Sequence, residues 1–191
     1  AHKICVAYEG MERFFEKNKI IITGNPVRQG LINHNISREK AIETFGLNPK
    51  KKTILILGGS LGARTINQCL MENLEIIKQS EVQFIWQTGK IYINEAHAAY
   101  VKAGSPTIIH VTDFISDMAT AYQAADLIIS RAGAGSISEF CLLAKPVILV
   151  PSPNVAEDHQ TQNALALVNK NAAIYVKDIE AKNLLINKAI E

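Results

Sequence analysis

The chain has 191 residues, of which 48% are hydrophobic and 20% are charged, and its formal net charge is +2. This composition is typical of a globular domain with a substantial core, excludes a disordered chain, and gives no case for binding nucleic acid. No apolar run approaches the roughly 18 residues of a membrane span, and the first residues, Ala1-His2-Lys3, lack a signal-peptide pattern.

Three cysteines, Cys5, Cys69 and Cys141, are far apart in the sequence and none belongs to a CxxC pair. Each lies within an apolar pattern, which predicts reduced, buried thiols in a cytoplasmic protein. We expect no metal site from them.

The first residues of the chain have a pattern of their own. Two short apolar runs, Ile4–Tyr8 and Ile20–Thr23, flank a helical pattern over Met11–Lys17. The apolar side of this pattern would suit a membrane or a partner, but we expect the small helix to pack on its own strands.

The sequence Gly24-Asn25-Pro26 interrupts regular structure and is typical of a hinge. It predicts a domain boundary near residues 24–28. We expect residues 1–24 to be the tail of an N-terminal domain that is missing here, and residues 25–191 to be a second domain, truncated at its C-terminus.

From residue 53 onward, apolar strand-like runs alternate with helical patterns. Strands are expected at Thr53–Leu57, Val82–Gln87, Thr107–Val111, Leu127–Ser130, Val147–Val150 and Ala173–Val176. Helices are expected near 63–78, 91–103, 117–124, 136–143, 159–169 and 179–191. Because the strands are apolar throughout, each is expected to be buried on both faces, with Trp86 in the core. The pattern predicts an α/β fold with a Rossmann-like, doubly wound parallel sheet, which binds ligands at the carboxyl ends of its strands.

A glycine-rich loop, Gly58-Gly59-Ser60, follows the first of these strands, where doubly wound folds place a phosphate. The two glycines permit close backbone approach, and Ser60 adds a hydroxyl donor. The spacing is neither that of a Walker A loop nor that of the GxGxxG fingerprint, and the next strand ends in Gln87 rather than in an acid. A nicotinamide enzyme is therefore disfavoured, and a simple tight turn is the alternative.

A second glycine turn, within Ser130–Glu139, joins an apolar strand to a helix start. Gly133 and Gly135 would allow a tight turn that brings N–H groups close to a ligand, and the helix start favours an anion. Glu139, about one turn into the helix, would lie beside the same opening. Amides for a diphosphate and a carboxylate for ribose hydroxyls suit a nucleotide; the alternatives are an exposed helix position for Glu139 and a surface cation for Arg131.

Two other segments could contact such a ligand. Thr112–Met118 follows a strand and could close over a planar base, or it is simply a capped helix start. Glu157–Asn163 opens a helix with Asp158 placed as N-cap, and could bind sugar hydroxyls or only cap the helix. His159 has no nucleophile motif near it, so we do not expect it to be a catalytic base.

Together these segments resemble one family, MurG, the cytoplasmic N-acetylglucosaminyltransferases of peptidoglycan synthesis. The matching stretches are GNPVR at 24–28, GGSLGARTIN at 58–67, TDFISDMATAYQAADLIISRAGAGSISE at 112–139 and KPVILVPSPNVAEDHQTQNA at 145–164. The resemblance implies the C-terminal half of a two-domain GT-B fold, in which the C-terminal domain binds UDP-N-acetylglucosamine and the N-terminal domain binds the lipid-linked acceptor. The implied reaction is inverting transfer of N-acetylglucosamine to the 4-hydroxyl of the N-acetylmuramyl unit of lipid I, which gives lipid II and UDP.

The resemblance also implies roles for residues at the phosphates and the base. Arg28 and Ser60 would approach the diphosphate, with the loop of Gly58 and Gly59 toward the acceptor. Ile115 would offer backbone groups to uracil.

For the second glycine turn and the sugar, the resemblance implies that Ser136 and the amides from Gly133 to Gly135 face the phosphates. Glu139 would hold the ribose hydroxyls. His159 and Gln160 would meet the hydroxyls of N-acetylglucosamine, with the role of Gln160 the firmer of the two because some relatives carry Gln at the position of His159.

In the resembling family, the proposed catalytic base, the acceptor loops and the membrane patch lie mainly in the N-terminal domain. The resemblance therefore implies no catalytic residue in this chain, no metal and no cofactor, and no transfer by this chain alone. It implies that the complete enzyme sits peripherally on the cytoplasmic face of the bacterial inner membrane, and that the part in this chain is soluble.

Two other classes stay open. One is another GT-B-like enzyme that uses a UDP-sugar, such as a UDP-N-acetylglucosamine 2-epimerase or a glycolipid glucosyltransferase. The other is a nucleotide-binding module without catalysis. The preference among UDP-sugars tests the alternative of another GT-B-like enzyme. The effect of Glu139→Gln on UDP-sugar binding tests the alternative of a non-catalytic module.

Overall fold

The computed structural model describes residues 1–32, 35–155 and 158–191, and its main feature is a six-stranded sheet in which all neighbouring strands are parallel. The strands are β3 (Thr53–Leu57), β4 (Gln83–Gln87), β5 (Ile109–Thr112), β6 (Leu127–Ser130), β7 (Val147–Leu149) and β8 (Ile174–Tyr175). Their order across the sheet is β5-β4-β3-β6-β7-β8, which is the Rossmann order. The predicted doubly wound α/β fold is confirmed.

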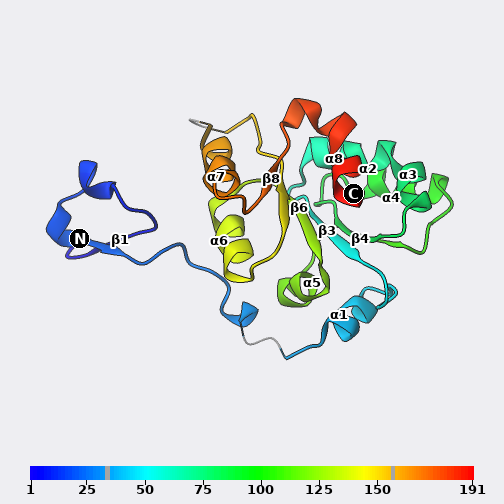
Figure 1. Cartoon of the computed structure of the whole chain (residues 1–191), viewed down its shortest axis with the longest axis horizontal. Helices are drawn as coiled ribbons and strands as arrows, with labels where there is room; N and C mark the ends of the chain where they lie inside the picture. Colours follow the sequence, from blue (N-terminus) through cyan, green and yellow to red (C-terminus); the bar gives the residue numbers. More distant parts are fainter. Residues whose placement is uncertain (33–34, 156–157) are drawn as a thin grey trace.

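Helices cover both faces of this sheet, as Figure 1 shows. One face carries α1 (Arg38–Thr44), α5 (Met118–Ala124), α6 (Ala134–Leu142) and α7 (His159–Val168). The other carries α2 (Arg64–Glu72), α3 (Leu74–Gln79), α4 (Ile93–Lys102) and α8 (Ala181–Ile190), which the 3-10 turn η5 (Asp178–Glu180) precedes. Side chains of β3 alternate between the two cores, with Leu55 and Leu57 in the first and Ile54 and Ile56 in the second. This alternation explains why the strands read as unbroken apolar runs.

Trp86 is fully buried in the second core, as predicted. Its indole N–H donates to Oδ1 of Asn67 at 2.9 Å, and Nδ2 of Asn67 donates to the carbonyl of Thr88 at 2.8 Å. These two hydrogen bonds satisfy the buried polar groups of Trp86 and Asn67, and they connect α2 to the end of β4.

The helices differ from the prediction at two places in the main domain. The helix expected over 63–78 is two helices that meet at Asn73, whose Nδ2 donates to the carbonyl of Cys69 at 2.8 Å. A side chain that competes in this way for helix carbonyls interrupts the helix. Helix α1 was not predicted; Ser37 caps it by accepting from the N–H of Lys40 at 3.3 Å.

The first residues form a small unit apart from the main sheet. Strands β1 (Ile4–Val6) and β2 (Ile20–Ile22) pair in parallel, and Figure 1 shows them away from the other elements, at the end of an extended linker. The helix predicted over 11–17 is wrong: the segment holds two 3-10 turns, η1 (Met11–Arg13) and η2 (Lys17–Lys19), with no buried residue in either. Phe14 is 62% exposed rather than packed on the strands.

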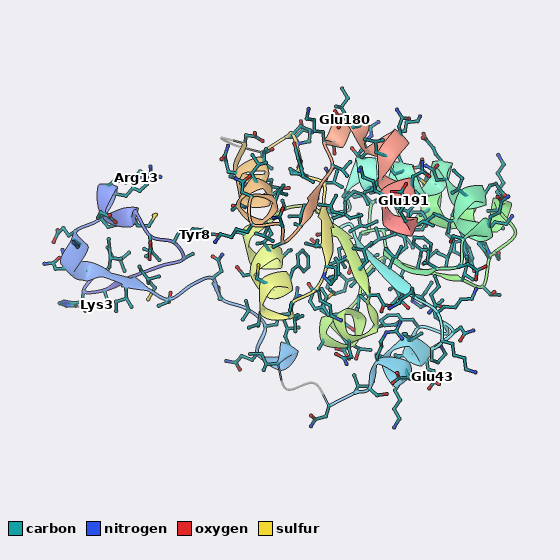
Figure 2. The ribbon with its side chains drawn as sticks, in the orientation of Figure 1. Lys3, Tyr8, Arg13, Glu43, Glu180 and Glu191 are labelled. Atoms are coloured by element: carbon teal, nitrogen blue, oxygen red, sulfur yellow. The ribbon has the colours of Figure 1, made fainter. Side chains whose placement is uncertain are left out.

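The linker contacts both parts of the chain. Nδ2 of Asn25 donates to the hydroxyl of Tyr8 at 3.1 Å and to Oγ of Ser138 on α6 at 3.0 Å. Figure 2 shows Tyr8 between the small unit and the main body. Beyond the linker, the 3-10 turn η3 (Gln29–Leu31) buries Leu31 in the first core. The division of the chain near residues 24–28 stays a prediction.

The predicted free thiols are confirmed for all three cysteines, but burial is confirmed for only one. Cys69 is buried, whereas Cys5 and Cys141 are exposed, and all three thiols are free. Cys141 lies on the outer side of α6, and Cys5 lies on a strand of a sheet too small to bury it. Among the described residues, His, Cys, Asp and Glu side chains form no group of three or more that could hold a metal ion.

Candidate donor-binding site

A cavity of about 290 Å³ opens at the carboxyl edge of the sheet. It lies where the chain order of the strands reverses, between β3 and β6, which is where doubly wound folds bind ligands. Most of the predicted residues line it: Arg28, Gly58, Gly59, Ser60, Ile115, Gly133, Ser136 and Gln160. The other three, Gly135, Glu139 and His159, are not among its lining residues.

A larger cavity of about 580 Å³ lies at the opposite, amino edge of the sheet. Its walls are mostly apolar and come from α6, α7 and the starts of β6 to β8. None of the predicted residues lines it. Size alone does not mark the site, because ligand recognition also needs polar groups that converge, and these gather at the carboxyl edge.

The loop after β3 lies close against the loop after β4. The N–H of Gly58 donates to the carbonyl of Gln87 at 2.9 Å, and a Cβ on Gly58 would lie only 2.8 Å from that oxygen. Gly59 has a φ of +73°, which side chains rarely adopt. Both glycines are therefore required by the loop itself. The loop presents Ser60 to the cavity.

The turn into α6 is built differently from the prediction. The helix begins at Ala134, two residues earlier than expected, with Gly133 as N-cap at φ −69° and ψ 139°. Neither Gly133 nor Gly135 has a positive φ, and a Cβ on Gly135 would meet nothing within 4 Å. The two glycines were expected to make the turn tight through backbone conformations that other residues resist, and neither adopts such a conformation. What they leave is open space at the N-terminus of a helix, with unpaired N–H groups and the positive end of its dipole.

Glu139 lies on α6 and is buried, so the alternative of an exposed helix residue is excluded. Its Oε2 accepts from Nη1 of Arg28 at 2.8 Å and from the hydroxyl of Tyr122 at 2.7 Å. Both donors line the cavity. The carboxylate therefore lies just behind the wall of the cavity, where Arg28 and Tyr122 separate it from the opening.

Ile115 is positioned by Gln87, whose place at the end of a strand had only disfavoured NAD. Oε1 of Gln87, at the end of β4, accepts from the backbone N–H of Ile115 at 3.1 Å. Gln87 is buried and lines the cavity. The N–H expected at uracil is thus bonded to Gln87, and a ligand would have to replace that partner. Phe114 beside it is 51% exposed.

Gln160 bridges two loops at the carboxyl edge. Its Oε1 accepts from the N–H of Ala132, after β6, at 3.2 Å and from the N–H of Ser152, after β7, at 2.9 Å. With the oxygen held in this way, the amide presents its Nε2 donor end, which suits a sugar hydroxyl or carbonyl. His159 is exposed and does not line the cavity. Asp158 precedes α7 at the N-cap position, but its side chain accepts from the hydroxyl of Thr161 at 2.7 Å and not from a backbone N–H. Glu157 lies outside the described residues.

Arg131 is not a surface cation, which was the alternative left open for it. Its Nη1 donates to the carbonyls of Val150 at 3.0 Å and Pro151 at 3.1 Å, and it forms an ion pair with Asp178 of η5. Asp178 also accepts from the hydroxyl of Thr65 on α2 at 2.8 Å. These contacts fix the loops after β6 and β7 to the other face of the sheet. The residues are far apart in the sequence, so no local signal could have paired them.

Comparison with known families bears directly on this site. The chain matches the model of the glycosyltransferase family 28 C-terminal domain over residues 53–191, which includes the complete six-stranded sheet. The chain belongs to this glycosyltransferase family. The resemblance to the MurG family is confirmed by two relatives, both called UDP-N-acetylglucosamine--N-acetylmuramyl-(pentapeptide) pyrophosphoryl-undecaprenol N-acetylglucosamine transferase. One, from Phocaeicola vulgatus, is 78% identical over all 191 residues, and the other, from Bacteroides fragilis, is 69% identical.

Solved structures agree with this assignment. MurG from Acinetobacter baumannii is 32% identical to the chain, with a TM-score of 0.68, and the match covers 100% of this chain and 52% of that one. WaaG, a glycosyltransferase of lipopolysaccharide biosynthesis, is 16% identical with a TM-score of 0.58 and supports the fold alone. The predicted C-terminal half of a GT-B fold is confirmed. The chain spans about half the length of the curated relatives that it matches.

Proposed function

We propose that this chain is the donor-binding half of an inverting glycosyltransferase, which transfers N-acetylglucosamine from UDP-N-acetylglucosamine to lipid I in peptidoglycan synthesis. The names of the curated relatives support the reaction and its substrates. The observation that carries the proposal is the cavity at the β3/β6 switch point, where two glycine-rich turns and a cation converge.

The diphosphate of the donor fits the most polar part of this cavity. Arg28 supplies positive charge, Ser60 a hydroxyl, and the first turn of α6 supplies N–H groups and the positive end of its dipole. These same groups would stabilise the one additional negative charge that develops on the β-phosphate as UDP leaves. The proposal includes no metal and no cofactor.

The nucleoside and the sugar would lie on either side of the diphosphate. Uracil would lie against Ile115, reaching its N–H by replacing Gln87. The ribose hydroxyls would bind Glu139. Gln160 would donate to the N-acetylglucosamine through Nε2, and His159, at the start of the same helix, would meet its hydroxyls.

Transfer itself requires the half of the enzyme that precedes this chain. The oxygen of the acceptor 4-hydroxyl would bond to the anomeric carbon as the bond from that carbon to the UDP oxygen breaks, and a base in the N-terminal half would take the hydroxyl proton. We propose that residues 1–24 are the tail of that half, which also carries the lipid I site and the main membrane contact at the inner face of the bacterial membrane. Among the described residues, no helix is long and apolar enough to cross a bilayer.

Calorimetric titration of this chain with UDP-N-acetylglucosamine tests the proposal, with UDP-N-acetylgalactosamine and NAD as comparison ligands. The expected result is saturable binding with a Kd of ~0.1 to 1 mM, weaker binding of the galacto epimer, and no heat from NAD. Binding of NAD without binding of the UDP-sugars would overturn the proposal. Turnover of lipid I by this chain alone would contradict the assignment of the base to the N-terminal half.

A further inference from the structure

The Glu139 carboxylate is shared by two donors with very different surroundings. Oε2 of Glu139 accepts from both Arg28 and Tyr122, and the Glu139 side chain is only 10% exposed. The two donors line the cavity while Glu139 does not. A ligand in the cavity that bonds to Oε2 of Glu139 therefore has to displace one of these donors.

Arg28 is the donor that can leave. Its side chain is 58% exposed, and it follows the Gly24-Asn25-Pro26 linker rather than an element of the sheet. The carboxylate end of this ion pair is buried, but the guanidinium end is open to water, which competes with Glu139 for it, so Arg28 leaves more readily than a buried donor would. A diphosphate in the cavity also offers Arg28 a stronger partner than a single carboxylate oxygen.

Tyr122 is the donor that stays. It lies on α5, is 2% exposed, and its ring packs edge-on against Phe140 of α6 with the ring centroids 5.9 Å apart. Burial is the main cause that raises the pKa of Tyr122, and the hydrogen bond to Glu139 and the negative charge of Glu139 raise it further. The phenol therefore keeps its proton at neutral pH and remains a donor. Its position is set by the core and does not depend on the linker.

We propose that Tyr122 is a positioning residue, whose hydroxyl holds the Glu139 carboxylate in place while the ribose hydroxyls of the donor replace Arg28. This inference rests on the proposed function, because it takes the cavity to bind a ribonucleotide. One carboxylate oxygen is then oriented before the ligand arrives, and the side chain loses less conformational freedom on binding. The displaced Arg28 moves to the diphosphate, so the same event that binds the ribose breaks the contact of Arg28 with α6, while Asn25 keeps its hydrogen bond to Ser138.

The test compares the affinity of this chain for UDP and for 2′,3′-dideoxy-UDP, by calorimetry, in several variants. Wild type is expected to prefer UDP. Tyr122→Phe removes only the hydroxyl and is expected to reduce that preference fivefold to tenfold, while affinity for the dideoxy nucleotide changes less than twofold. Tyr175→Phe is the matched control, since Tyr175 packs against the same core but does not line the cavity. It is expected to leave both affinities unchanged.

Two more variants separate positioning from a loss of structure. In Glu139→Gln, adding Tyr122→Phe is expected to have no further effect on the preference for UDP. Arg28→Ala is expected to weaken both nucleotides but to keep or raise the preference, because the competitor for Glu139 is gone. Equal weakening of both nucleotides by Tyr122→Phe, or an unchanged preference, would overturn the role of Tyr122 alone. A wild-type chain that does not distinguish the two nucleotides would overturn the ribose contact of Glu139, and this inference with it.

Discussion

Replacing Gly133 with alanine separates what the ligand needs from what the fold needs. Gly133 has backbone angles that any residue adopts, and an added Cβ would have Oγ of Ser136, at 3.9 Å, as its nearest neighbour. Replacing a glycine with alanine stabilises the folded state by about 0.4 to 1 kcal/mol, because the unfolded chain has less conformational entropy to lose. Alanine is a poorer N-cap than glycine, which costs a similar amount. We expect the free energy of unfolding to change by less than about 0.5 kcal/mol.

Binding should respond quite differently. The new methyl group would stand in the cavity at the N-terminus of α6, where the diphosphate must approach the N–H groups. We expect Gly133→Ala to weaken UDP binding at least tenfold, or about 1.4 kcal/mol. Urea unfolding and calorimetric titration of the same preparation measure the two effects independently.

Gly58→Ala is the contrasting variant at the same cavity. A Cβ on Gly58 would lie 2.8 Å from the carbonyl oxygen of Gln87 and 2.9 Å from that of Thr88, and both are backbone atoms that cannot move aside alone. We expect a loss of about 1 to 3 kcal/mol in the free energy of unfolding, as for an overpacked site. The reasoning is refuted if Gly133→Ala binds UDP as wild type does, or if it destabilises the fold as much as Gly58→Ala.

Three further predictions concern the fold. Burial opposes ionisation of Asp126, but the N–H of Thr53 and the neighbouring cations hold its pKa below the usual value. The ionised carboxylate therefore contributes fully to the free energy of unfolding at neutral pH, and this contribution is lost as pH falls through the pKa of the folded protein. We expect Asp126→Asn to cost about 1 kcal/mol at pH 7 and less at pH 3, measured by urea unfolding; an equal cost at both pH values would contradict this. Asp178→Asn should destabilise by about 1 to 3 kcal/mol by removing the ion pair of Arg131, and a double-mutant cycle with Arg131→Met that shows no coupling would exclude it. Burial, then nearby carboxylates, raises the pKa of Cys69 to about 11, so at pH 8 a thiol reagent should label the two exposed cysteines quickly and Cys69 only after denaturation.

The candidate site shows how far a sequence can lead. The loops after β3 and β6 were predictable because each glycine-rich stretch directly follows an apolar strand, and parallel strands place such loops at one edge. Eight of the eleven predicted site residues line a single cavity. The family resemblance gave no indication that Gln87 or Tyr122 belongs to the site. Neither residue lies in a glycine turn, and each forms its hydrogen bond with a residue elsewhere in the chain.

The reason for a glycine was also beyond the sequence. Gly58 and Gly133 read alike as loop glycines, yet one is required by carbonyls of a neighbouring strand end and the other faces open space. Only the distances from a hypothetical Cβ distinguish them. The same limit explains the error at residues 11–17, where the helical pattern had no core on which to pack and formed two 3-10 turns.

The sequence by itself determined the strands, their parallel arrangement and the edge at which a ligand binds, because these follow from local backbone preference and from burial of both faces of each strand. Tertiary structure alone decided the partners. Arg28 meets Glu139 across 111 positions, and Arg131 meets Asp178 across 47. Such pairs form where the fold brings two side chains within hydrogen-bonding distance, and spacing along the chain carries no record of that distance.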